Sequence, residues 1–355
     1  MIGVGHPKDV HFWKNIISNL EKKGHEIKIV AWNKDVTLYL LDTYGFSYEI
    51  LGESCKSLMK KAYRLSKSGL ISLKIAKKFK PDILTGREPN LAHISKLIRK
   101  PFIMISDTEH GTLSHLLTYP FSDAICTPAC FKRTINPKKH ITFNGYQELA
   151  YLHPKYFKLD QSVLDDFGLS RDDRYIIIRF VAWSGSHDIG QYGFTDKERL
   201  VRKLENYGRI FITSEKKLSK RLEKYRITIP PDKMHDLLYY ATIYIGEGAT
   251  MASEAAVLGT PAIYVNTLRL GYLDEEEKKY GLVYIFSNPK TAQEQAIKKA
   301  IELLDDKELK NKWKKKRERL LKEKIDVTKF MTNFIENYPE SRRIIKGNIE
   351  PQDVV

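Results

Sequence analysis

The stretch MHDLLYYATIYIGEGATMASEAAVLGTPAIYV, residues 234–265, decides the fold class of this chain. Its pattern predicts a helix over 234–241, a strand over 243–245, a glycine-containing turn, a helix to residue 258, a Gly-Thr-Pro turn and a strand over 262–265. A strand, helix, strand order of this kind predicts a parallel sheet with helices on both faces.

The turn in this stretch has the composition of a phosphate-binding turn. Gly246, Gly248 and Ala249 are small enough for the backbone to approach a ligand closely. The unpaired amides and the dipole of the helix that follows attract a phosphate, and Thr250 could cap that helix or donate to a phosphate oxygen. Glu254 lies one turn into the helix, where its carboxylate could accept both hydroxyls of a ribose. The alternative is an ordinary βαβ turn with a solvated Glu254.

The same alternation runs through the whole chain of 355 residues and restarts after Asn144-Gly145, a turn signal. We therefore predict an α/β protein with two Rossmann-like domains. Residues 1–146 form the first domain, 147–339 form the second, whose last helices could pack back on the first, and 340–355 form a flexible tail. The strands expected in the first domain are 1–4, 26–31, 48–51, 82–85, 102–106, 124–127 and 141–143. Those expected in the second are 175–180, 209–213, 227–229, 243–245, 262–265 and 283–286.

The stretch over 243–265 resembles the nucleotide-sugar site of the GT-B superfamily. In the N-acetylglucosaminyltransferase of peptidoglycan synthesis and in the non-hydrolysing UDP-N-acetylglucosamine 2-epimerase, a Gly/Ser-rich turn precedes a helix with a Glu, then Gly-x-Pro and a strand. Nearly the whole chain is similar to an uncharacterised, mainly archaeal family of unknown function in that superfamily. This similarity is carried by GHPKDVHF, DTEH, FNGYQELAYLHP, RFVAWSGSHDIG and GEGATMASEAAVLGTPAI.

The resemblance implies a GT-B fold with a cleft between its two domains. It also implies that Glu254 binds the ribose and that Gly248, Ala249 and Thr250 flank the diphosphate. The loop near Arg226 and Ile227 would hold the base by backbone contacts. The superfamily contains transferases, epimerases and phosphorylases, so the fold alone does not decide the reaction.

A second candidate segment is RFVAWSGSHDIG, residues 179–190, which follows a strand and opens into a Ser/Gly loop. Loops after the first strand of a Rossmann domain face the ligand. Arg179, Ser184, Ser186 and His187 could therefore contact phosphate, and the resemblance to the epimerase implies a role for His187. The alternative is a polar turn with Arg179 in a surface ion pair.

Two segments of the first domain could supply acid–base groups. His6 follows the first strand in GVGHPKDVH and could act as a general base, because imidazole titrates near neutrality. Asp107, Glu109 and His110 follow a later strand, and two carboxylates with a histidine suit proton transfer. The alternatives are a backbone-bonded His6 and an Asp107 or Thr108 that caps the next helix. A metal site is not predicted.

The net charge of +16 favours anionic partners, but no RNA-binding aromatic motif or helix-turn-helix accompanies it, so nucleic acid is not expected. A basic amphipathic helix over 56–80 could lie on an anionic membrane, although a core-facing helix with a charged outer face is the favoured interpretation. Without a signal peptide or a spanning segment, we expect a cytoplasmic protein, with peripheral contact at the inner face of the membrane left open.

Together these features predict a glycosyltransferase that uses a nucleoside diphosphate sugar, UDP-linked, with a glycan or lipid-linked acceptor and no cofactor. His6, Asp107 or Glu109 would deprotonate the acceptor, and the amides near Gly248 and Thr250 would stabilise the departing diphosphate. The alternatives are a 2-epimerase-like isomerase and a non-catalytic sugar-nucleotide-binding protein. The Gly-Asp-Thr and Glu-Ala-Gly segments of the epimerase appear in this chain as TGREPN and DTEHGT, which leaves the epimerase set of acid–base groups incomplete. The sequence does not indicate the oligomeric state.

Overall fold

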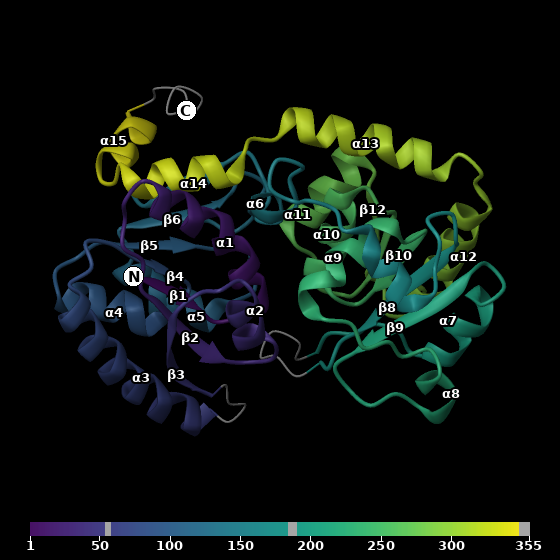
Figure 1. The fold of residues 1–355 in the computed structure, drawn as a ribbon, viewed down its shortest axis with the longest axis horizontal. Helices are drawn as coiled ribbons and strands as arrows, with labels where there is room; N and C mark the ends of the chain where they lie inside the picture. Colours follow the sequence, from purple (N-terminus) through teal and green to yellow (C-terminus); the bar gives the residue numbers. More distant parts are fainter. Residues whose placement is uncertain (54–57, 184–189, 348–355) are drawn as a thin grey trace. The chain divides into compact units, whose positions relative to one another are not determined.

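A computed structural model describes residues 1–53, 58–183 and 190–347 of the chain (Figure 1). The chain divides into two compact units. Unit 1 comprises Met1–Tyr151 and Ile325–Val355, and unit 2 comprises Leu152–Lys324. Unit 1 therefore extends past residue 146 and takes in the last helices, which the sequence analysis counted with the second domain.

Unit 1 is built on a parallel sheet with the strand order β3-β2-β1-β4-β5-β6-β7. Its strands are β1 (Ile2–Val4), β2 (Ile29–Asn33), β3 (Tyr48–Glu53), β4 (Leu84–Gly86), β5 (Phe102–Ile105), β6 (Ala124–Pro128) and β7 (His140–Phe143). The central strands are short, and every residue of β1, β4 and β5 is buried. Such strands need helices on both faces of the sheet.

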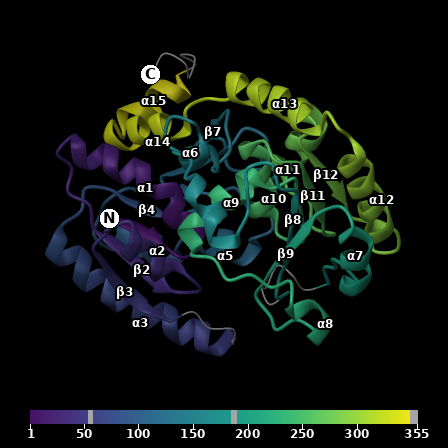
Figure 2. The ribbon, with the colours of Figure 1, turned by 45° about the vertical axis from the view of Figure 1, so that its right-hand side comes forward.

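The helices of unit 1 lie over this sheet (Figures 1 and 2). In α1, Val10, Trp13, Ile17 and Leu20 are buried at helical spacing, and α14 packs against this helix. The helices are α1 (Pro7–Lys22), α2 (Thr37–Thr43), α3 (Leu58–Phe79), α4 (Pro89–Leu97), α5 (Thr112–Thr118), α6 (Leu149–Leu152, at the junction with unit 2), α14 (Val327–Glu336) and α15 (Glu340–Lys346), with a helical turn η1 (Tyr119–Phe121).

Helix α3 is the basic helix noted in the sequence. Ala76 is buried in the core of unit 1, whereas Lys74, Lys77 and Lys78 are exposed. This part of α3 therefore packs one side on the core and exposes its lysines, which agrees with the favoured prediction of a core-facing helix. Among the described helices, none has the length and the apolar character that crossing a membrane requires.

Unit 2 is built on a second parallel sheet with the strand order β12-β11-β10-β8-β9. Its strands are β8 (Tyr175–Phe180), β9 (Arg209–Ser214), β10 (Ile243–Gly246), β11 (Ala262–Val265) and β12 (Val283–Phe286). Its helices are α7 (Lys197–Leu204), α8 (Lys220–Glu223), α9 (Met234–Tyr240), α10 (Ala249–Leu258), α11 (Gly271–Glu275), α12 (Ala292–Asp305) and α13 (Leu309–Glu323), with helical turns η2 (Gln161–Phe167), η3 (Pro231–Lys233) and η4 (Glu276–Tyr280).

Two sequence predictions are wrong. The strand expected over 227–229 is only a single bridge between Arg226 and Ile212, because Pro230 and Pro231 follow and cannot donate to a ladder. The flexible tail expected from residue 340 begins instead with α15, where Ser341 is buried and its hydroxyl bonds the carbonyl of Phe334 at 2.7 Å. Residues 348–355 lie outside the described residues.

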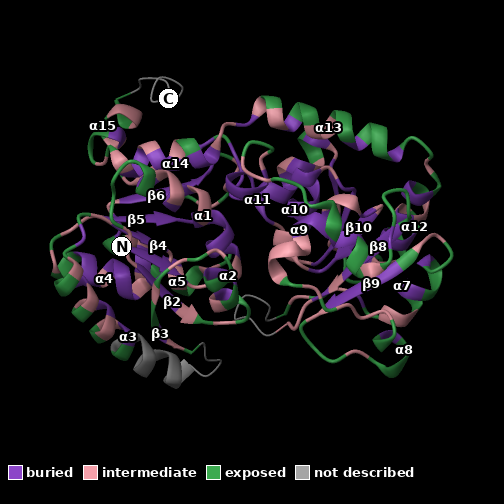
Figure 3. Cartoon of the chain, in the orientation of Figure 1, coloured by how far each residue is buried: buried purple, intermediate pink, exposed green. Residues whose placement is uncertain are grey.

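Burial distinguishes the sheets from the charged helix α13 (Figure 3). The strands of both units are mostly buried, whereas α13 is largely exposed apart from Leu309, Trp313 and Leu320. The lysine-rich stretch over 307–324 therefore presents a mostly solvated face.

Candidate nucleotide and acid–base sites

The strand order of unit 2 identifies a ligand-binding position in this unit. From β8 the chain passes to β9 on one side, and the remaining strands follow on the other side, starting with β10. Open α/β sheets bind ligands at such a switch point, outside the carboxyl ends of the strands. Here Val181 follows β8 and Glu247 follows β10, so the two glycine-containing segments singled out in the sequence meet at this position.

Helix α10 begins at this switch point without a side-chain cap. Its N-cap residue is Gly248, which has no side chain that could cap the helix. Thr250 does not cap it either, because it is already the second residue of the helix. In the described part of the chain, no group accepts a hydrogen bond from the backbone N–H groups of Ala249, Thr250 and Met251. These residues are only half-buried. Unpaired amides at an accessible helix N-terminus form an anion-binding arrangement.

Gly246 is required by close packing at the end of β10. A Cβ atom at this position would lie 2.2 Å from the hydroxyl oxygen of Tyr244 and 3.0 Å from Cβ of Arg179. The Tyr244 hydroxyl also donates to the carbonyl of Gly248 at 3.3 Å. The glycine therefore lets the turn pass close to β8 and hold the N-cap residue in place.

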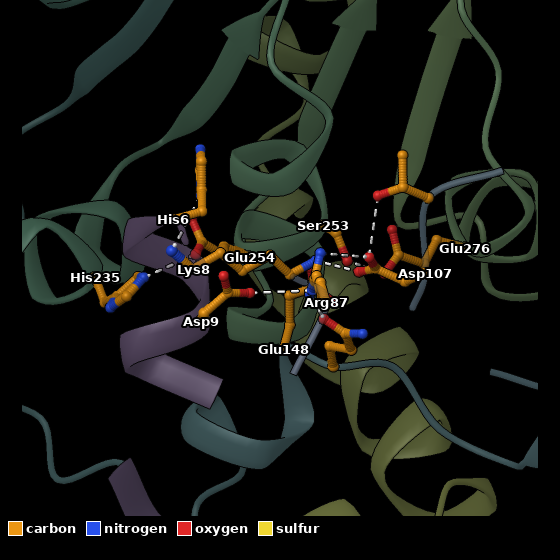
Figure 4. A network of polar contacts seen from close by, with 12 residues as sticks. His6, Lys8, Asp9, Arg87, Asp107, Glu148, His235, Ser253, Glu254 and Glu276 are labelled. Atoms are coloured by element: carbon orange, nitrogen blue, oxygen red, sulfur yellow. Dashed lines mark hydrogen bonds and ion pairs between the residues drawn. The ribbon is translucent and has the colours of Figure 1, made fainter. Parts of the chain in front are cut away.

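Glu254 is buried and paired, and is not the solvated side chain that was the alternative prediction. Its Oε1 lies 3.0 Å from Nε2 of His235 on α9 (Figure 4), and the residue is 7% exposed. The His235 ring also packs edge-to-face on Phe157, with ring centroids 6.4 Å apart. His235 therefore orients the carboxylate that the sequence analysis assigned to the ribose.

Arg179 makes the surface ion pair that the sequence analysis gave as the alternative to phosphate contact. Its NH2 group lies 2.8 Å from Oε1 of Glu215, whose Oε2 accepts a hydrogen bond from the amide of Ala182 at 3.0 Å. Ser184, Ser186 and His187 lie outside the described residues.

The expected base-binding loop near Arg226 and Ile227 lies beside the edge strand β9. The Ile227 amide donates to the carbonyl of Ile212 at 3.0 Å, so it is not available to a base. A cavity of about 570 Å³ adjoins this edge, and its lining includes Phe167, Tyr225 and both loop residues.

In unit 1 the corresponding switch point lies between β1 and β4, and it holds a buried charge network (Figure 4). The Lys8 ammonium contacts the carboxylates of Asp107 and Glu148, the latter at 2.6 Å. Arg87 pairs with Asp9 at 3.1 Å and with Asp107 at 3.4 Å. These carboxylates and Lys8 are all at most 6% exposed. The network joins the segments that follow β1, β4, β5 and β7.

Glu88 adds a further buried carboxylate beside Arg87. A Cβ atom on Gly3, Gly5 or Gly86 would lie within 2.6 Å of a Glu88 carboxylate oxygen, so the three glycines make room for this group. Loss of hydration and the nearby Asp9 raise the pKa of Glu88 to about 7, although the Arg87 amide donates to its Oε2 at 2.9 Å. Glu88 therefore titrates near neutrality.

The network contains more carboxylates than cations, and their protonation differs. Burial opposes the charge on Asp107, but Lys8 and Arg87 hold the pKa of that carboxyl below its ordinary value. Burial raises the pKa of Glu148 despite its contact with Lys8. Titratable groups whose pKa values are pushed apart in one site can divide acid and base roles.

His6 caps the first helix of unit 1. Its Nδ1 accepts a hydrogen bond from the Lys8 amide at 3.2 Å, which is the backbone-bonded alternative of the sequence analysis. Although its side chain is exposed, loss of hydration among the surrounding protein atoms and the nearby cations Lys34, Arg87 and Lys8 lower the pKa of this imidazole. Because Nδ1 accepts the hydrogen bond from the Lys8 amide, the proton of the neutral ring lies on Nε2, which is therefore a hydrogen-bond donor.

The remaining acid–base candidates of unit 1 are Glu109 and His110. Glu109 accepts a hydrogen bond from the amide of Lys132 at 3.3 Å, and His110 is exposed. Helix α5 is capped by Gly111 rather than by Asp107 or Thr108. Within the described ranges, no three His, Cys, Asp or Glu side chains are grouped so that they could hold a metal ion.

Comparison with known proteins identifies the family of the chain. Residues 1–339 match the family model described as "Protein of unknown function (DUF354)". The chain belongs to this family. The DUF354 protein is also 24% identical over 267 residues to the uncharacterized protein MJ0665 of Methanocaldococcus jannaschii, with 72% of this chain and 77% of that protein covered.

A second relative of the DUF354 protein is named as a transferase. The chain is 24% identical over 255 residues to the UDP-N-acetylglucosamine–N-acetylmuramyl-(pentapeptide) pyrophosphoryl-undecaprenol N-acetylglucosamine transferase of Lactococcus lactis. The match covers 69% of this chain and 68% of the transferase.

Solved structures resemble the DUF354 protein over most of its length. The UDP-GlcNAc 2-epimerase of Methanocaldococcus jannaschii matches with a TM-score of 0.60 and 15% identity, covering 86% of this chain and 92% of the epimerase. A spinosyn rhamnosyltransferase matches with a TM-score of 0.60 and 15% identity, covering 95% of this chain and 100% of the transferase. The prediction of an α/β fold of the GT-B type with two Rossmann-like domains is confirmed.

Sequence reasoning missed several functional candidates in the DUF354 protein. Lys8 lies in the segment that was singled out for His6 alone, and Arg87 and Glu148 lie in segments that were quoted for the departure from the epimerase and for the family resemblance. The weak signal was that each follows a strand of unit 1, at the sheet edge where ligands bind. His235 had no such signal, because its partner Glu254 lies on a different helix.

Proposed function

We propose that the DUF354 protein is a glycosyltransferase that binds a nucleoside diphosphate sugar, UDP-linked, in unit 2. The observation that carries this proposal is the open N-terminus of α10 at the switch point of the sheet. The similarity to a transferase with a UDP-sugar in its name supports the choice of substrate class.

The nucleotide part of the donor would be held by α9, α10 and the turn between β10 and α10. The amides of Ala249 and Thr250 would donate to the diphosphate, and the helix dipole would favour its negative charge. Glu254, oriented by His235, would accept hydrogen bonds from the ribose hydroxyls. During transfer the same amides would stabilise the leaving nucleoside diphosphate.

Unit 1 would supply the acid–base groups. The low pKa of Asp107 and its two cationic partners make it a poor proton acceptor, so its main role would be to hold Lys8 and Arg87. Glu88, which titrates near neutrality, is the better candidate to deprotonate an acceptor hydroxyl. His6, a neutral imidazole whose Nδ1 is occupied by the Lys8 amide, would instead donate a hydrogen bond from Nε2. The acceptor would be a glycan or a lipid-linked sugar. Glu109 and His110 are candidates for contact with that acceptor.

A sugar-nucleotide 2-epimerase is the second candidate function. The observation that favours it is the network of carboxylates in unit 1, because epimerisation must remove and return protons. The likeness to solved epimerases is of fold alone.

Incubation of the purified protein with UDP-N-acetylglucosamine, followed by chromatography of the nucleotides, tests these functions. Release of UDP, increased by glycan or lipid-linked acceptors, is the expected result. A new UDP-sugar without free UDP would favour the epimerase instead. Saturable binding without turnover across donors and acceptors would leave only a sugar-nucleotide-binding protein, and no binding of any nucleoside diphosphate would refute the proposal.

A further inference from the structure

Glu247 is a buried carboxylate to which the proposed mechanism assigns no role. It follows β10 directly, precedes the N-cap residue of α10, and is 1% exposed. Its Oε2 accepts a hydrogen bond from the amide of Val181 at 3.0 Å, and its Oε1 accepts one from the amide of Phe194 at 2.9 Å. One side chain therefore binds the backbone on both sides of residues 184–189, which lie outside the described part of the chain.

The backbone of Glu247 is held as firmly as its side chain. Its amide donates to the carbonyl of Arg179 at 3.1 Å, and its carbonyl accepts a hydrogen bond from Nδ2 of Asn266 at 3.1 Å. The residue thus joins the segments that follow β8, β10 and β11.

The packing around the carboxylate leaves little freedom. A Cβ atom on Gly193 would lie 2.3 Å from Oε1 of Glu247 and 2.5 Å from Cζ2 of Trp183. The missing side chain at Gly193 therefore gives the carboxylate the space in which it reaches both amides.

We propose that Glu247 is a positioning residue of the nucleotide site, which fixes the start of α10 relative to Val181 and Phe194 without contacting the nucleotide. This inference rests on the proposed function, because it concerns the pose of the amides that would bind the diphosphate. Those amides belong to Ala249 and Thr250, close behind Glu247 in sequence. A small error in the pose of preorganised donors weakens their hydrogen bonds to a ligand.

The charge of Glu247 acts in the opposite direction from its hydrogen bonds. A carboxylate beside the helix start repels a diphosphate, so removal of the charge alone would tighten nucleotide binding. Removal of the two amide contacts would loosen it. The Glu247→Gln variant separates these effects, because the Gln side chain keeps the size and loses the charge, and its NH2 group must face one of the two amide N–H groups.

The experiment is calorimetric titration of UDP into the wild type, Glu247→Gln and Glu247→Asp, at a temperature where all are folded. The aspartate keeps the charge but is too short to reach both amides. Both variants are expected to bind UDP about tenfold more weakly, the order of magnitude for one lost buried hydrogen bond. A charge effect predicts tighter binding by Glu247→Gln and unchanged binding by Glu247→Asp, and that result would overturn the inference.

Gln293→Met is the matched control. The Oε1 atom of Gln293 accepts hydrogen bonds from the amides of Thr195 and Asp196, at 3.0 and 2.8 Å, just beyond Phe194. This variant is expected to lower the melting temperature but to change UDP affinity less than twofold. If UDP affinity fell equally in the control, Glu247 would have only a structural role, and the inference would be wrong. Absence of UDP binding by the wild type would refute the proposed function, whereas wild-type binding with unchanged Glu247 variants would refute the positioning role alone.

Discussion

Nε2 of His235 lies 3.0 Å from Oε1 of Glu254, which joins helices α9 and α10 across the face of the second sheet. The carboxylate is buried, so this contact determines how it is presented. The pair gives the proposed ribose ligand a fixed orientation before a nucleotide binds. Preorganisation of this kind reduces the cost of binding.

Replacement of Glu254 by Ala is expected to weaken UDP binding by roughly 10- to 100-fold, because a hydrogen bond to a charged group contributes about 1.5–3 kcal/mol. His235→Ala is expected to weaken it less, because it removes the orientation but keeps the carboxylate. Titration calorimetry with UDP measures both, and circular dichroism checks the fold. Unchanged affinity in Glu254→Ala would show that the ribose is bound elsewhere.

Replacement of Lys8 by Met is expected to destabilise unit 1 by about 3–5 kcal/mol, because Asp107 and Glu148 would lose their buried cation. The double variant Lys8→Met/Asp107→Asn is expected to recover part of this loss. Urea unfolding of the three proteins measures the effect. A loss of under about 1 kcal/mol in the single variant, typical of a surface pair, would contradict a buried network.

The raised pKa of Glu88 predicts a specific pH dependence of stability. The folded state holds the Glu88 proton up to about pH 7, whereas the unfolded chain releases it near the ordinary glutamate pKa of 4.5. The contribution of Glu88 to the free energy of unfolding therefore falls by up to about 3 kcal/mol as the pH rises from about 5 to 7. Above pH 7 this contribution is constant. The change in urea midpoint from pH 5 to pH 8 is therefore expected to be more negative in the wild type than in Glu88→Gln, which lacks the titrating carboxyl. Equal differences would mean that Glu88 is ionised throughout.

The space that Gly5 leaves for Glu88 can be tested by a double-mutant cycle. A Cβ atom at Gly5 would lie 2.6 Å from Oε1 of Glu88, so Gly5→Ala is expected to cost about 1–3 kcal/mol. In a Glu88→Ala background the same change is expected to cost much less, because the obstructing carboxylate is gone. Additive losses in the cycle would show that the two residues do not interact.

Much of the fold could be predicted because its strands are short apolar runs separated by turn residues. The strand at 175–180 and those at 262–265 and 283–286 agree with the structure, and α10 starts one residue after Gly248. The strand expected at 227–229 failed because apolar residues alone do not supply a neighbouring strand. The tail failed because α15 is stabilised by a tertiary contact, Ser341 with Phe334, that no local pattern reveals.

The candidate sites could be predicted only where ligand chemistry lies within one segment. The phosphate-binding turn was visible because its glycines and helix start are contiguous in the sequence. The charge network was not, because Lys8, Asp107 and Glu148 are brought together only by the order of the strands. Glu88 was overlooked for the same reason, since its raised pKa depends on Asp9 and on burial rather than on its own neighbours in sequence.

The binding of a diphosphate to the start of α10 can be observed through the amide of Thr250. Deuterated protein with ¹⁵N-threonine would be titrated with UDP and, separately, with uridine, and Thr250→Ser would identify the resonance. The Thr250 amide resonance is expected to shift saturably with UDP and to remain in place with uridine, which lacks the diphosphate. Saturable UDP binding that leaves this resonance unmoved would show that the diphosphate is held elsewhere.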